Sequence, residues 1–472
     1  METPLTLLRK RSLDDWLAGH DAQAFLNQTE AFAQQFSDLT LQKILITESD
    51  PVRFLAGFIA ACSTVPQVFL GNPVWGESEW RQALAIVEPD WVLGNCPWVE
   101  DNLSGRRSHP QKPDDKNCDR LIMIPTGGSS GEVRFAMHRW QTLTASVEGF
   151  RQFFQLAKVN SICVLPLYHV SGLMQFMRSF LSGGRLLMIP YKDLKVGNGA
   201  WIDPTEYFIS LVPTQLQHLL EDEALASWLS QCKTVLLGGA PSWSGLLDKA
   251  RGKQISLAPC YGMTETASQI VTLKLERFLR GDTSSGQVLP HAAVKIVDAY
   301  GEDLACGQIG KIVIQASSLA LGYYPEFFSA SELEVGGFLT DDAGFLDSQG
   351  NLTLVGRLSS KIITGGENVF PVEVESAIRS TQLVQDVSVI GLPDPYWGQM
   401  LTAVYTPRIS TLSPQQIEDA IQTKIARFKR PKLWISVEQL PRNAQGKINR
   451  KAIQQLALRW RQANSPAESS AH

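Results

Sequence analysis

Four near-continuous apolar runs, separated by helical patterns, constrain the fold of this chain most strongly. Strands that do not alternate apolar and polar residues are buried on both faces, which is typical of a parallel sheet covered by helices. An α/β alternation also precedes them, with strands expected at KILITES and WVLGN and a helix at PVRFLAGFIAACST. The sequence therefore predicts an α/β fold. The four runs are SICVLPL, GGRLLMIP, YFISLVP and KTVLLGGA.

The pattern changes after residue 285. The segment AAVKIVDAYGEDLACGQIGKIVIQA is rich in β-branched residues and turns, which predicts an antiparallel β subdomain. GFLDSQGNLTLVGR predicts a β-hairpin that turns at Gln349–Gly350, and Pro371 is placed to open a helix. The polar stretch 103–120 is expected to be a surface loop.

A chain of 472 residues is too long for one core, so we expect an α/β multidomain protein. The boundaries that composition indicates are a large N-terminal domain over 1–357, which combines α/β sheets with the β subdomain, and a small mobile α+β domain over 358–458. A hinge is expected near Gly356–Ser360, and the small polar residues of 459–472 predict a disordered tail.

Charge and cysteine usage exclude several classes of protein. A net charge of −4, from 43 basic and 47 acidic residues, offers no basic surface for nucleic acid. Seven scattered cysteines, never spaced C-x-x-C, predict no disulfide framework and no metal cage. No apolar run reaches the roughly 18 residues of a membrane span. We therefore expect a soluble cytoplasmic protein, whose oligomeric state the sequence does not indicate.

The segment MIPTGGSSGEVRFAMH has two chemical interpretations. Gly127, Ser129 and Gly131 fit the G-x-S-x-G nucleophile elbow of serine hydrolases, which requires a strand, a sharp turn and then a helix. Residues 133–138 instead alternate apolar and polar side chains, which predicts a second strand. A strand–loop–strand arrangement favours a hairpin whose loop contacts a ligand. The loop is not a P-loop (Walker A), because the motif G-x-x-x-x-G-K-[ST] is absent.

Such a loop suits phosphate binding. Glycines let backbone N–H groups approach phosphate oxygens, hydroxyls donate to them, and Arg134 supplies a cation. Taken alone, the same composition also fits a plain polar turn. The residues concerned are Thr126, Gly127, Gly128, Ser129, Ser130 and Gly131.

Six motifs in order resemble those of the adenylate-forming enzymes, the superfamily of acyl- and aryl-CoA synthetases, nonribosomal adenylation domains and luciferases. They span roughly 120–452 and are PTGGSSGEVR, PLYHVSGL, YGMTETAS, GFLTDDAGFLD, GRLSSKIITGGENVFPVEVE and PRNAQGKINRK. LPLYHVSGLMQFMRSFLSGGRLLM, SLVPTQLQHLL and YGMTETASQIVTL look most like the 2-succinylbenzoate–CoA ligase family. IPTGGSSGEVRFAMH resembles its cyanobacterial and plant-type branch.

This resemblance implies two half-reactions. A carboxylate of 2-succinylbenzoate attacks the α-phosphate of ATP, giving an acyl-adenylate and pyrophosphate, and the thiol of coenzyme A then displaces AMP. Mg²⁺ is the implied metal, and the implied partners are these small molecules alone. Another aryl- or acyl-CoA synthetase of the superfamily is an alternative, as is a serine hydrolase that uses Ser129. A degenerate ligase kept as a binding protein is a third.

The resemblance also implies a set of ATP contacts. Thr126–Gly131 and Arg134 would hold the β- and γ-phosphates, with Arg134 where the family has lysine and Val133 where it has proline. Asp342 would accept the ribose hydroxyls, although Asp341 replaces the usual glycine and leaves open which of the two does so. The remaining implied ATP or AMP contacts are Gly239, Ala240, Tyr261 (adenine), Gly262, Met263, Thr264 (α-phosphate) and Arg357 (ribose or phosphate), with Glu265 as the Mg²⁺ ligand.

Lys447 resembles the lysine that the family brings over the active site from the small domain. A cation near phosphate contributes about 4 kcal/mol at an effective dielectric of about 20, so its loss should slow adenylation strongly. His169 would orient the acyl group, and Gly365 and Gly366 would line the path of coenzyme A. Candidates for binding the acid itself are Ser171, Arg178 and Gln215.

Overall fold

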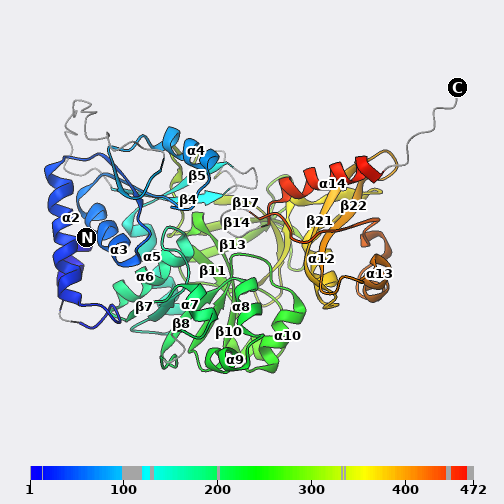
Figure 1. The fold of residues 1–472 in the computed structure, drawn as a ribbon, viewed down its shortest axis with the longest axis horizontal. Coiled ribbons are helices and arrows are strands. Elements are labelled where there is room, and N and C mark those ends of the chain that lie inside the picture. Colours follow the sequence, from blue (N-terminus) through cyan, green and yellow to red (C-terminus); the bar gives the residue numbers. More distant parts are fainter. Residues whose placement is uncertain are drawn as a thin grey trace.

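The computed structural model describes residues 2–12, 14–97, 120–127, 132–198, 202–330, 333, 336–442 and 448–464. Three sheets organise these residues (Figure 1). The surface loop predicted for 103–120 lies outside the described residues, apart from Arg120. Among the helices that are described, none is both long enough and apolar enough to cross a membrane.

The first sheet has seven strands in the order β16-β15-β5-β4-β2-β1-β3. β1, β2, β3 and β4 run parallel, whereas β5 pairs antiparallel with β4. The predicted strands at KILITES and WVLGN are therefore confirmed. The strands are β1 (Lys43–Thr47), β2 (Gln67–Leu70), β3 (Trp91–Gly94), β4 (Leu121–Gly127), β5 (Val133–His138), β15 (Gly322–Tyr323) and β16 (Glu326–Phe327), and the helices of this region are α1 (Pro4–Arg9), α2 (Ala22–Asp38), α3 (Pro51–Thr64) and α4 (Glu77–Val87).

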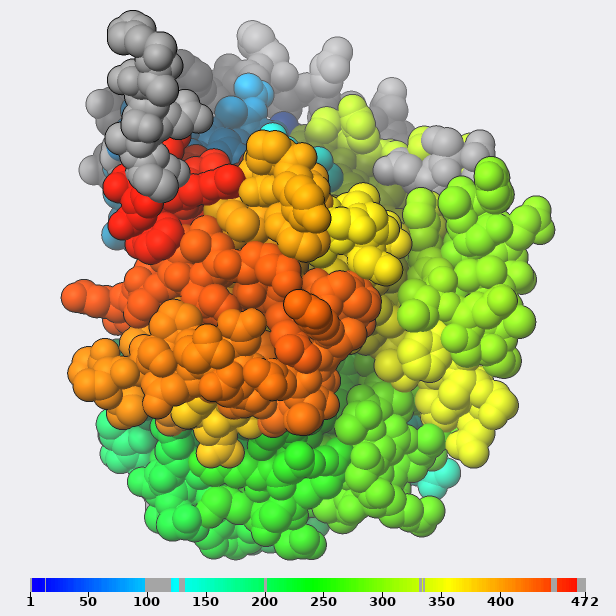
Figure 2. Space-filling model, turned by 90° about the vertical axis from the view of Figure 1, so that its right-hand side faces the viewer, coloured from blue at the N-terminus to red at the C-terminus, as the bar shows by residue number. Residues whose placement is uncertain are grey.

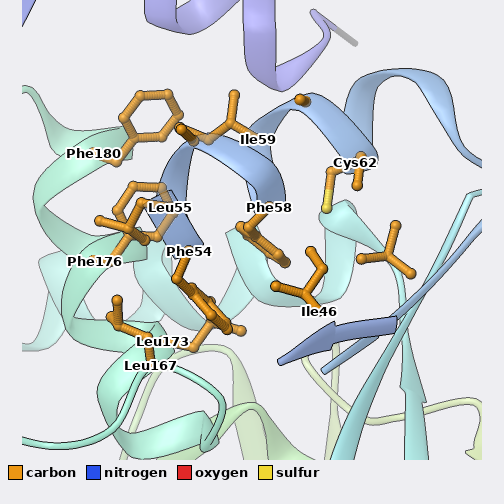
Figure 3. Packing of buried hydrophobic residues seen from close by; sticks show 14 of the residues in the cluster. Ile46, Phe54, Leu55, Phe58, Ile59, Cys62, Leu167, Leu173, Phe176 and Phe180 are labelled. Carbon is orange, nitrogen blue, oxygen red and sulfur yellow. The ribbon is translucent and has the colours of Figure 1, made fainter. Parts of the chain in front are cut away.

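Helix α3 forms the centre of the largest core. It begins at Pro51, and its N-cap Asp50 accepts a hydrogen bond from the Arg53 N–H. Its middle turns are apolar all round and fully buried, as expected of a helix enclosed by other elements. Phe58 meets Phe176 of α6 (Val170–Ser182) edge to face, with ring centroids 6.2 Å apart (Figure 3). This contact joins the first sheet's helices to those of the second.

The second sheet has eleven strands in the order β13-β14-β17-β18-β12-β11-β10-β9-β8-β6-β7. The four apolar runs are β6, β7, β8 and β9, which together with β10 form a parallel segment, as predicted. The remaining strands are antiparallel, which confirms the β subdomain. The strands are β6 (Asn160–Cys163), β7 (Leu186–Met188), β8 (Tyr207–Leu211), β9 (Thr234–Leu237), β10 (Leu257–Met263), β11 (Ser268–Thr272), β12 (Gly286–Val288), β13 (Ala292–Val297), β14 (Gly310–Ala316), β17 (Phe338–Leu346) and β18 (Asn351–Arg357).

Helices and short turns connect these strands. The predicted hairpin of β17 and β18 is confirmed, with Gly350 in the left-handed region at φ +76°. The connecting elements are α5 (Trp140–Phe154), α7 (Tyr191–Lys195), α8 (Pro213–Leu219), α9 (Glu223–Ser230), α10 (Ser244–Gly252), η2 (Thr264–Thr266), α11 (Leu275–Leu279) and η4 (Leu358–Ser360).

The third sheet begins after η4 and lies at the opposite end of the molecule from α2 (Figure 1). Its order is β20-β19-β22-β21, with β23 beside β22. Figure 2 shows this unit, in orange and red, seated over residues 200–260 in green. The elements are β19 (Ile362–Thr364), β20 (Glu367–Val369), α12 (Pro371–Arg379), β21 (Val384–Asp394), β22 (Gly398–Pro407), α13 (Pro414–Ile421), η5 (Arg427–Lys429), β23 (Leu433–Ser436) and α14 (Arg450–Asn464).

One boundary expectation was wrong. Helix α14 continues to Asn464, six residues into the 459–472 segment that was expected to be disordered. Arg461 stabilises this last turn, because its guanidinium donates to Pro393 O over 2.7 Å and to Asp394 Oδ2 over 3.2 Å. Residues 465–472 lie outside the described part of the chain.

Candidate active site

Several of the predicted site residues follow the ends of neighbouring parallel strands. His169 follows β6, Gln215 follows β8, and Gly239 and Ala240 follow β9, while Tyr261 lies near the end of β10. Parallel strands end at a common edge, which is where ligands bind in open α/β sheets. The topology therefore gathers motifs that are far apart in sequence.

Tyr261, Asp342 and Arg357 form a hydrogen-bonded group. The Tyr261 hydroxyl donates to Asp342 Oδ2 over 2.9 Å, and Arg357 Nε lies 3.4 Å from Asp342 Oδ1. Asp342 and Arg357 face each other across the β17–β18 ladder. Burial, with the neighbouring Asp342 carboxylate, raises the pKa of Tyr261 well above its usual value, so this phenol stays protonated and donates. The structure thus brings together three predicted nucleotide-binding residues.

Asp341 has a different role from Asp342. Its Oδ1 accepts from the Ser359 N–H over 2.9 Å, and its Oδ2 accepts from the Ser359 hydroxyl. Successive side chains of a strand point to opposite faces, so the two carboxylates cannot share a ligand. Asp342 is the member of the pair beside Tyr261, and Asp341 holds η4.

Glu265 is buried in the turn after β10, with 8% of its surface exposed. Its Oε1 accepts from the Tyr323 hydroxyl over 2.6 Å, and its backbone carbonyl accepts from the Ala320 N–H over 2.7 Å. The Arg134 guanidinium lies over the Tyr323 ring, 5.5 Å from the centroid. Tyr323 therefore touches two predicted site residues at once. Sequence reasoning missed it, because GYYPEF carries no pattern that points to a site.

His138 is a second residue that the sequence analysis did not identify. It is fully buried, and its Nε2 lies 2.8 Å from the carbonyl oxygen of Thr264. A carbonyl only accepts, so Nε2 carries the proton and donates. Burial lowers the pKa of His138 to about 4, so the ring is neutral near pH 7. It fixes the backbone of the predicted α-phosphate contact.

Gly262 is required by the backbone beside this turn. A Cβ there would lie 2.1 Å from the Ser268 carbonyl oxygen of β11, so no other residue fits without displacing a strand. Met263 donates its N–H to Thr266 Oγ1 over 3.0 Å, which closes the turn around Glu265. These two predicted residues shape the site through the backbone.

The glycine-rich segment is a hairpin, as predicted. Thr126 pairs with Arg134 and Gly127 with Val133 across the antiparallel β4–β5 ladder. No helix follows the loop directly, so the nucleophile-elbow interpretation lacks its structural context. Gly128, Ser129, Ser130 and Gly131 lie outside the described residues.

Ser171 and Arg178, two of the three candidates for binding the acid, lie on α6. His169 is its N-cap and packs edge-on against Tyr168, with centroids 4.6 Å apart. Ser171 is in the first turn. Arg178 is 2% exposed, donates to Ser268 Oγ and Gln269 Oε1 over 3.1 Å each, and lies over a phenylalanine ring. Burial lowers the pKa of Arg178 to about 10, which leaves the guanidinium charged near pH 7.

Gln215 has a local structural role. Its Oε1 accepts from the Val212 N–H over 3.0 Å and so caps the start of α8. Gln215 lies at the carboxyl edge of the parallel strands, where its Oε1 is occupied by the hydrogen bond from Val212.

Gly365 and Gly366 form the two-residue turn between β19 and β20. Both are left-handed, at φ +57° and +83°, which a type I′ hairpin turn requires at each central position. Gly365 donates its N–H to the Trp397 carbonyl over 2.9 Å. Their role toward coenzyme A stays a prediction. Lys447 lies outside the described residues.

The described residues contain no cluster of three or more His, Cys, Asp or Glu side chains that could hold a metal ion by themselves. Mg²⁺ in nucleotide sites is commonly bound by one or two carboxylates together with phosphate oxygens and water. Glu265 is a buried carboxylate in η2, and η2 contacts both strands of the β4–β5 hairpin, so Glu265 fits that coordination.

The Tyr261–Asp342–Arg357 group at the carboxyl edge of an α/β sheet, followed by a small α+β unit, is the arrangement expected of an adenylate-forming enzyme. Two family models match the chain accordingly: AMP-binding enzyme over residues 29–324, and AMP-binding enzyme C-terminal domain over residues 373–447. The chain belongs to the AMP-binding enzyme family.

Its curated relatives include several enzymes named 2-succinylbenzoate–CoA ligase. The chain is 33% identical to the 2-succinylbenzoate–CoA ligase of Enterococcus faecalis over 376 residues, covering 77% of this chain and 75% of that one. It is 34% identical to the enzyme of the same name from Listeria monocytogenes over 331 residues, covering 70% and 68%. This similarity makes the chain an AMP-forming acid–CoA ligase.

Solved structures show the same fold. The o-succinylbenzoate CoA synthetase MenE of Bacillus subtilis, in complex with its acyl-adenylate intermediate OSB-AMP, is 22% identical with a TM-score of 0.80, covering 96% of this chain and 98% of that one. ATP-bound MatB of Rhodopseudomonas palustris is also 22% identical, with a TM-score of 0.79 and the same coverage.

Proposed function

We propose that this chain is an ATP-dependent 2-succinylbenzoate–CoA ligase. One carboxylate of the acid attacks the α-phosphorus of ATP and displaces pyrophosphate, and the thiol of coenzyme A then attacks the acyl carbon and displaces AMP. The observation that carries the proposal is the Tyr261–Asp342–Arg357 group at the carboxyl edge, in a chain whose relatives bear that name.

The first half-reaction joins two anions, so charge neutralisation is the main contribution required of the protein. Asp342, which lies next to the buried ring of Tyr261, would accept hydrogen bonds from the ribose hydroxyls. Arg134 would bind the β- and γ-phosphates, and its planar guanidinium suits bidentate contact with phosphate. Mg²⁺, held through Glu265, would neutralise developing charge on the phosphate oxygens.

The acid pocket is proposed on α6. Ser171, Gln175 and Arg178 lie at positions i, i+4 and i+7, so they share one face of the helix. Arg178 Nε has no hydrogen-bond partner among the described residues. A buried, charged donor with a free N–H suits the second, non-reacting carboxylate of 2-succinylbenzoate. His169, at the N-cap of the same helix, would orient the reacting carboxylate.

The small unit is proposed to serve both half-reactions. We assign residues 1–357 to the large domain and 358–458 to the mobile domain, with Lys447 directed at the phosphates during adenylation. Rotation near η4 would then bring the Gly365–Gly366 turn toward the path of coenzyme A. The Asp341–Ser359 contact spans the proposed hinge.

We also propose that the enzyme acts in the cytoplasm. The six cysteines within the described residues are free thiols, which suits a reducing compartment. No described helix offers a membrane span.

A panel of acids tests the proposal. The purified chain, MgATP and coenzyme A are incubated with 2-succinylbenzoate, benzoate, malonate and medium-chain fatty acids, and AMP and acyl-CoA are measured. We expect the highest kcat/KM with 2-succinylbenzoate. Higher turnover of another acid would favour a different acyl-CoA synthetase of the family, and labelling of Ser129 by a serine-reactive phosphonate would support the hydrolase alternative.

A further inference from the structure

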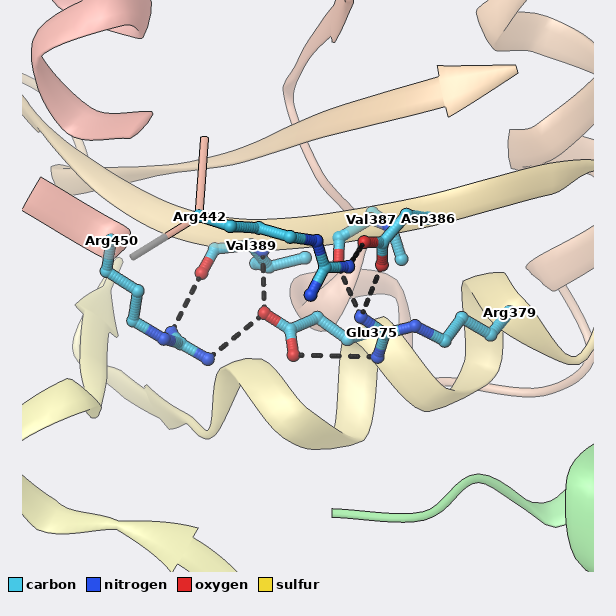
Figure 4. Close-up of polar contacts among 7 residues, drawn as sticks. All are labelled: Glu375, Arg379, Asp386, Val387, Val389, Arg442 and Arg450. Carbon is cyan, nitrogen blue, oxygen red and sulfur yellow. Dashed lines mark hydrogen bonds and ion pairs between the residues drawn. The ribbon is translucent and has the colours of Figure 1, made fainter. Parts of the chain in front are cut away.

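The α12–β21 region contains a buried carboxylate that none of the roles above uses. Glu375 of α12 is 5% exposed. Its Oε1 accepts from the Val389 N–H over 2.9 Å and from Arg450 Nη2 over 3.1 Å (Figure 4). Arg450 also donates to the Val389 carbonyl over 3.3 Å. Glu375 therefore fixes the first residue of α14 against strand β21.

A second carboxylate continues the network. Asp386 of β21 accepts from Arg379 Nη2 over 3.1 Å, and its other oxygen accepts from Arg442. Arg379 Nη1 lies 3.8 Å from Glu375 Oε2, which connects the two carboxylates. Figure 4 shows the three arginines converging on Glu375 and Asp386 from different segments.

Two of these arginines flank, in sequence, the stretch that contains Lys447. Arg442 precedes it and Arg450 follows it, and each is bound to a different carboxylate of the network. The flanks are also paired through the backbone: Arg442 and Ile448 form an antiparallel bridge, and the Asn449 N–H donates to the Pro441 carbonyl over 2.9 Å.

The network also contacts the large domain. The Arg379 guanidinium lies over the ring of Trp243, 5.6 Å from its centroid. Trp243 is the N-cap residue of α10, three residues after Ala240 in the loop that follows β9. A continuous set of contacts therefore runs from the loop after β9 to both flanks of the Lys447 stretch.

We infer that Glu375 and Asp386 are positioning residues for Lys447 in the adenylation half-reaction. The inference rests on the role proposed above for Lys447. A buried carboxylate paired with arginines adds little net stability compared with apolar packing, so the ion pairs around the buried Glu375 are better explained by the geometry that they impose on the flanks of the Lys447 stretch. A displacement of about 1 Å in a group that contacts the transition state can cost about a hundredfold in rate.

Half-reaction kinetics test this inference. Adenylation is measured as pyrophosphate release from MgATP and 2-succinylbenzoate without coenzyme A, and transfer as acyl-CoA formation from preformed 2-succinylbenzoyl adenylate. The variants are Glu375→Gln and Asp386→Asn, each made with Lys447 and with Lys447→Ala. The matched control is Glu373→Gln, on the same helix, whose partner Lys429 does not flank the stretch.

Glu375→Gln and Asp386→Asn should each slow adenylation at least about tenfold and leave the transfer rate within about twofold of wild type. In the Lys447→Ala background each variant should slow adenylation by less than about twofold more, because the effects of residues that act through one group are not additive. Glu373→Gln should leave both rates within about twofold of wild type.

Several outcomes would overturn the inference. One is equal loss of both half-reactions, and another is full additivity with Lys447→Ala. If Glu375→Gln lowers the unfolding temperature, its slow adenylation could reflect lost stability, and the half-buried Asp386 then provides the test. A folded Asp386→Asn protein with normal adenylation contradicts the inference. A wild-type protein that releases no pyrophosphate would instead refute the proposed function itself.

Discussion

Tyr323 donates a hydrogen bond from its hydroxyl to Glu265 Oε1 over 2.6 Å, while its ring lies beneath the Arg134 guanidinium. This one side chain thereby connects the proposed Mg²⁺ ligand to the proposed phosphate-binding cation. β15, which carries Tyr323, pairs with β5 at Ala136, two residues beyond Arg134, so the sheet itself sets the spacing.

Replacing Tyr323 by phenylalanine should weaken MgATP use. The change removes a hydrogen bond to a buried carboxylate, an interaction of about 1.5–3 kcal/mol, while the ring under Arg134 is kept. Adenylation should slow about ten- to a hundredfold, with a higher Mg²⁺ requirement. Pyrophosphate release across a Mg²⁺ titration measures this. Tyr324→Phe is the matched control, because that ring packs against Phe69, and it should behave as wild type.

Variants of the neighbouring carboxylates Asp341 and Asp342 should differ in their KM for ATP. Asp342→Asn removes the charge beside Tyr261 and Arg357, so the KM for ATP should rise about tenfold or more. Asp341→Asn weakens only the contact with Ser359, so the KM for ATP should stay within about twofold of wild type. Steady-state kinetics at saturating acid distinguish them. A larger ATP defect in the Asp341 variant would reverse the assignment.

Arg178→Gln should impair recognition of the acid without affecting that of the nucleotide. Losing a buried cation opposite a carboxylate should raise the KM for 2-succinylbenzoate about ten- to a hundredfold, with the KM for ATP unchanged. With 4-oxo-4-phenylbutanoate, which lacks the aromatic carboxylate, wild type and variant should differ little. An equal loss with both acids would mean that Arg178 only supports the fold around β11.

Stability should fall in mild acid because of His138. Its folded pKa of about 4 lies below the ordinary value of 6.5, so the unfolded chain binds more protons between these pH values. The stabilising contribution is therefore complete above about pH 6.5 and is lost as the pH falls toward 4, by up to about 1.4 kcal/mol per pH unit. Proton uptake on thermal unfolding near pH 5.5 should decrease by about one proton in His138→Gln. An unchanged uptake would show that the ring is not buried in its neutral form.

The sequence predicted those features that have a local pattern. The apolar runs of the parallel strands, the Gln349–Gly350 hairpin and the helix opened by Pro371 each leave a signature of periodicity or turn chemistry within a few residues. Motif order then located Tyr261, Asp342 and Arg357, which the structure joins.

The rest depends on contacts between distant segments, which no local pattern encodes. Tyr323 reaches Glu265 from a two-residue strand, and His138 reaches Thr264 from 126 residues away in sequence. The choice between Asp341 and Asp342 required knowing which face of β17 meets Tyr261. Helix α14 extends beyond its expected end because Arg461 finds partners on β21.

Pyrophosphate release on mixing the purified chain with MgATP and 2-succinylbenzoate tests the central claim most directly. Without coenzyme A, we predict a burst close to one equivalent per active site, as the acyl-adenylate stays bound. With coenzyme A, release should continue and match AMP and 2-succinylbenzoyl-CoA in amount. Absence of pyrophosphate with this acid, from a folded protein that binds ATP, would contradict the proposed function.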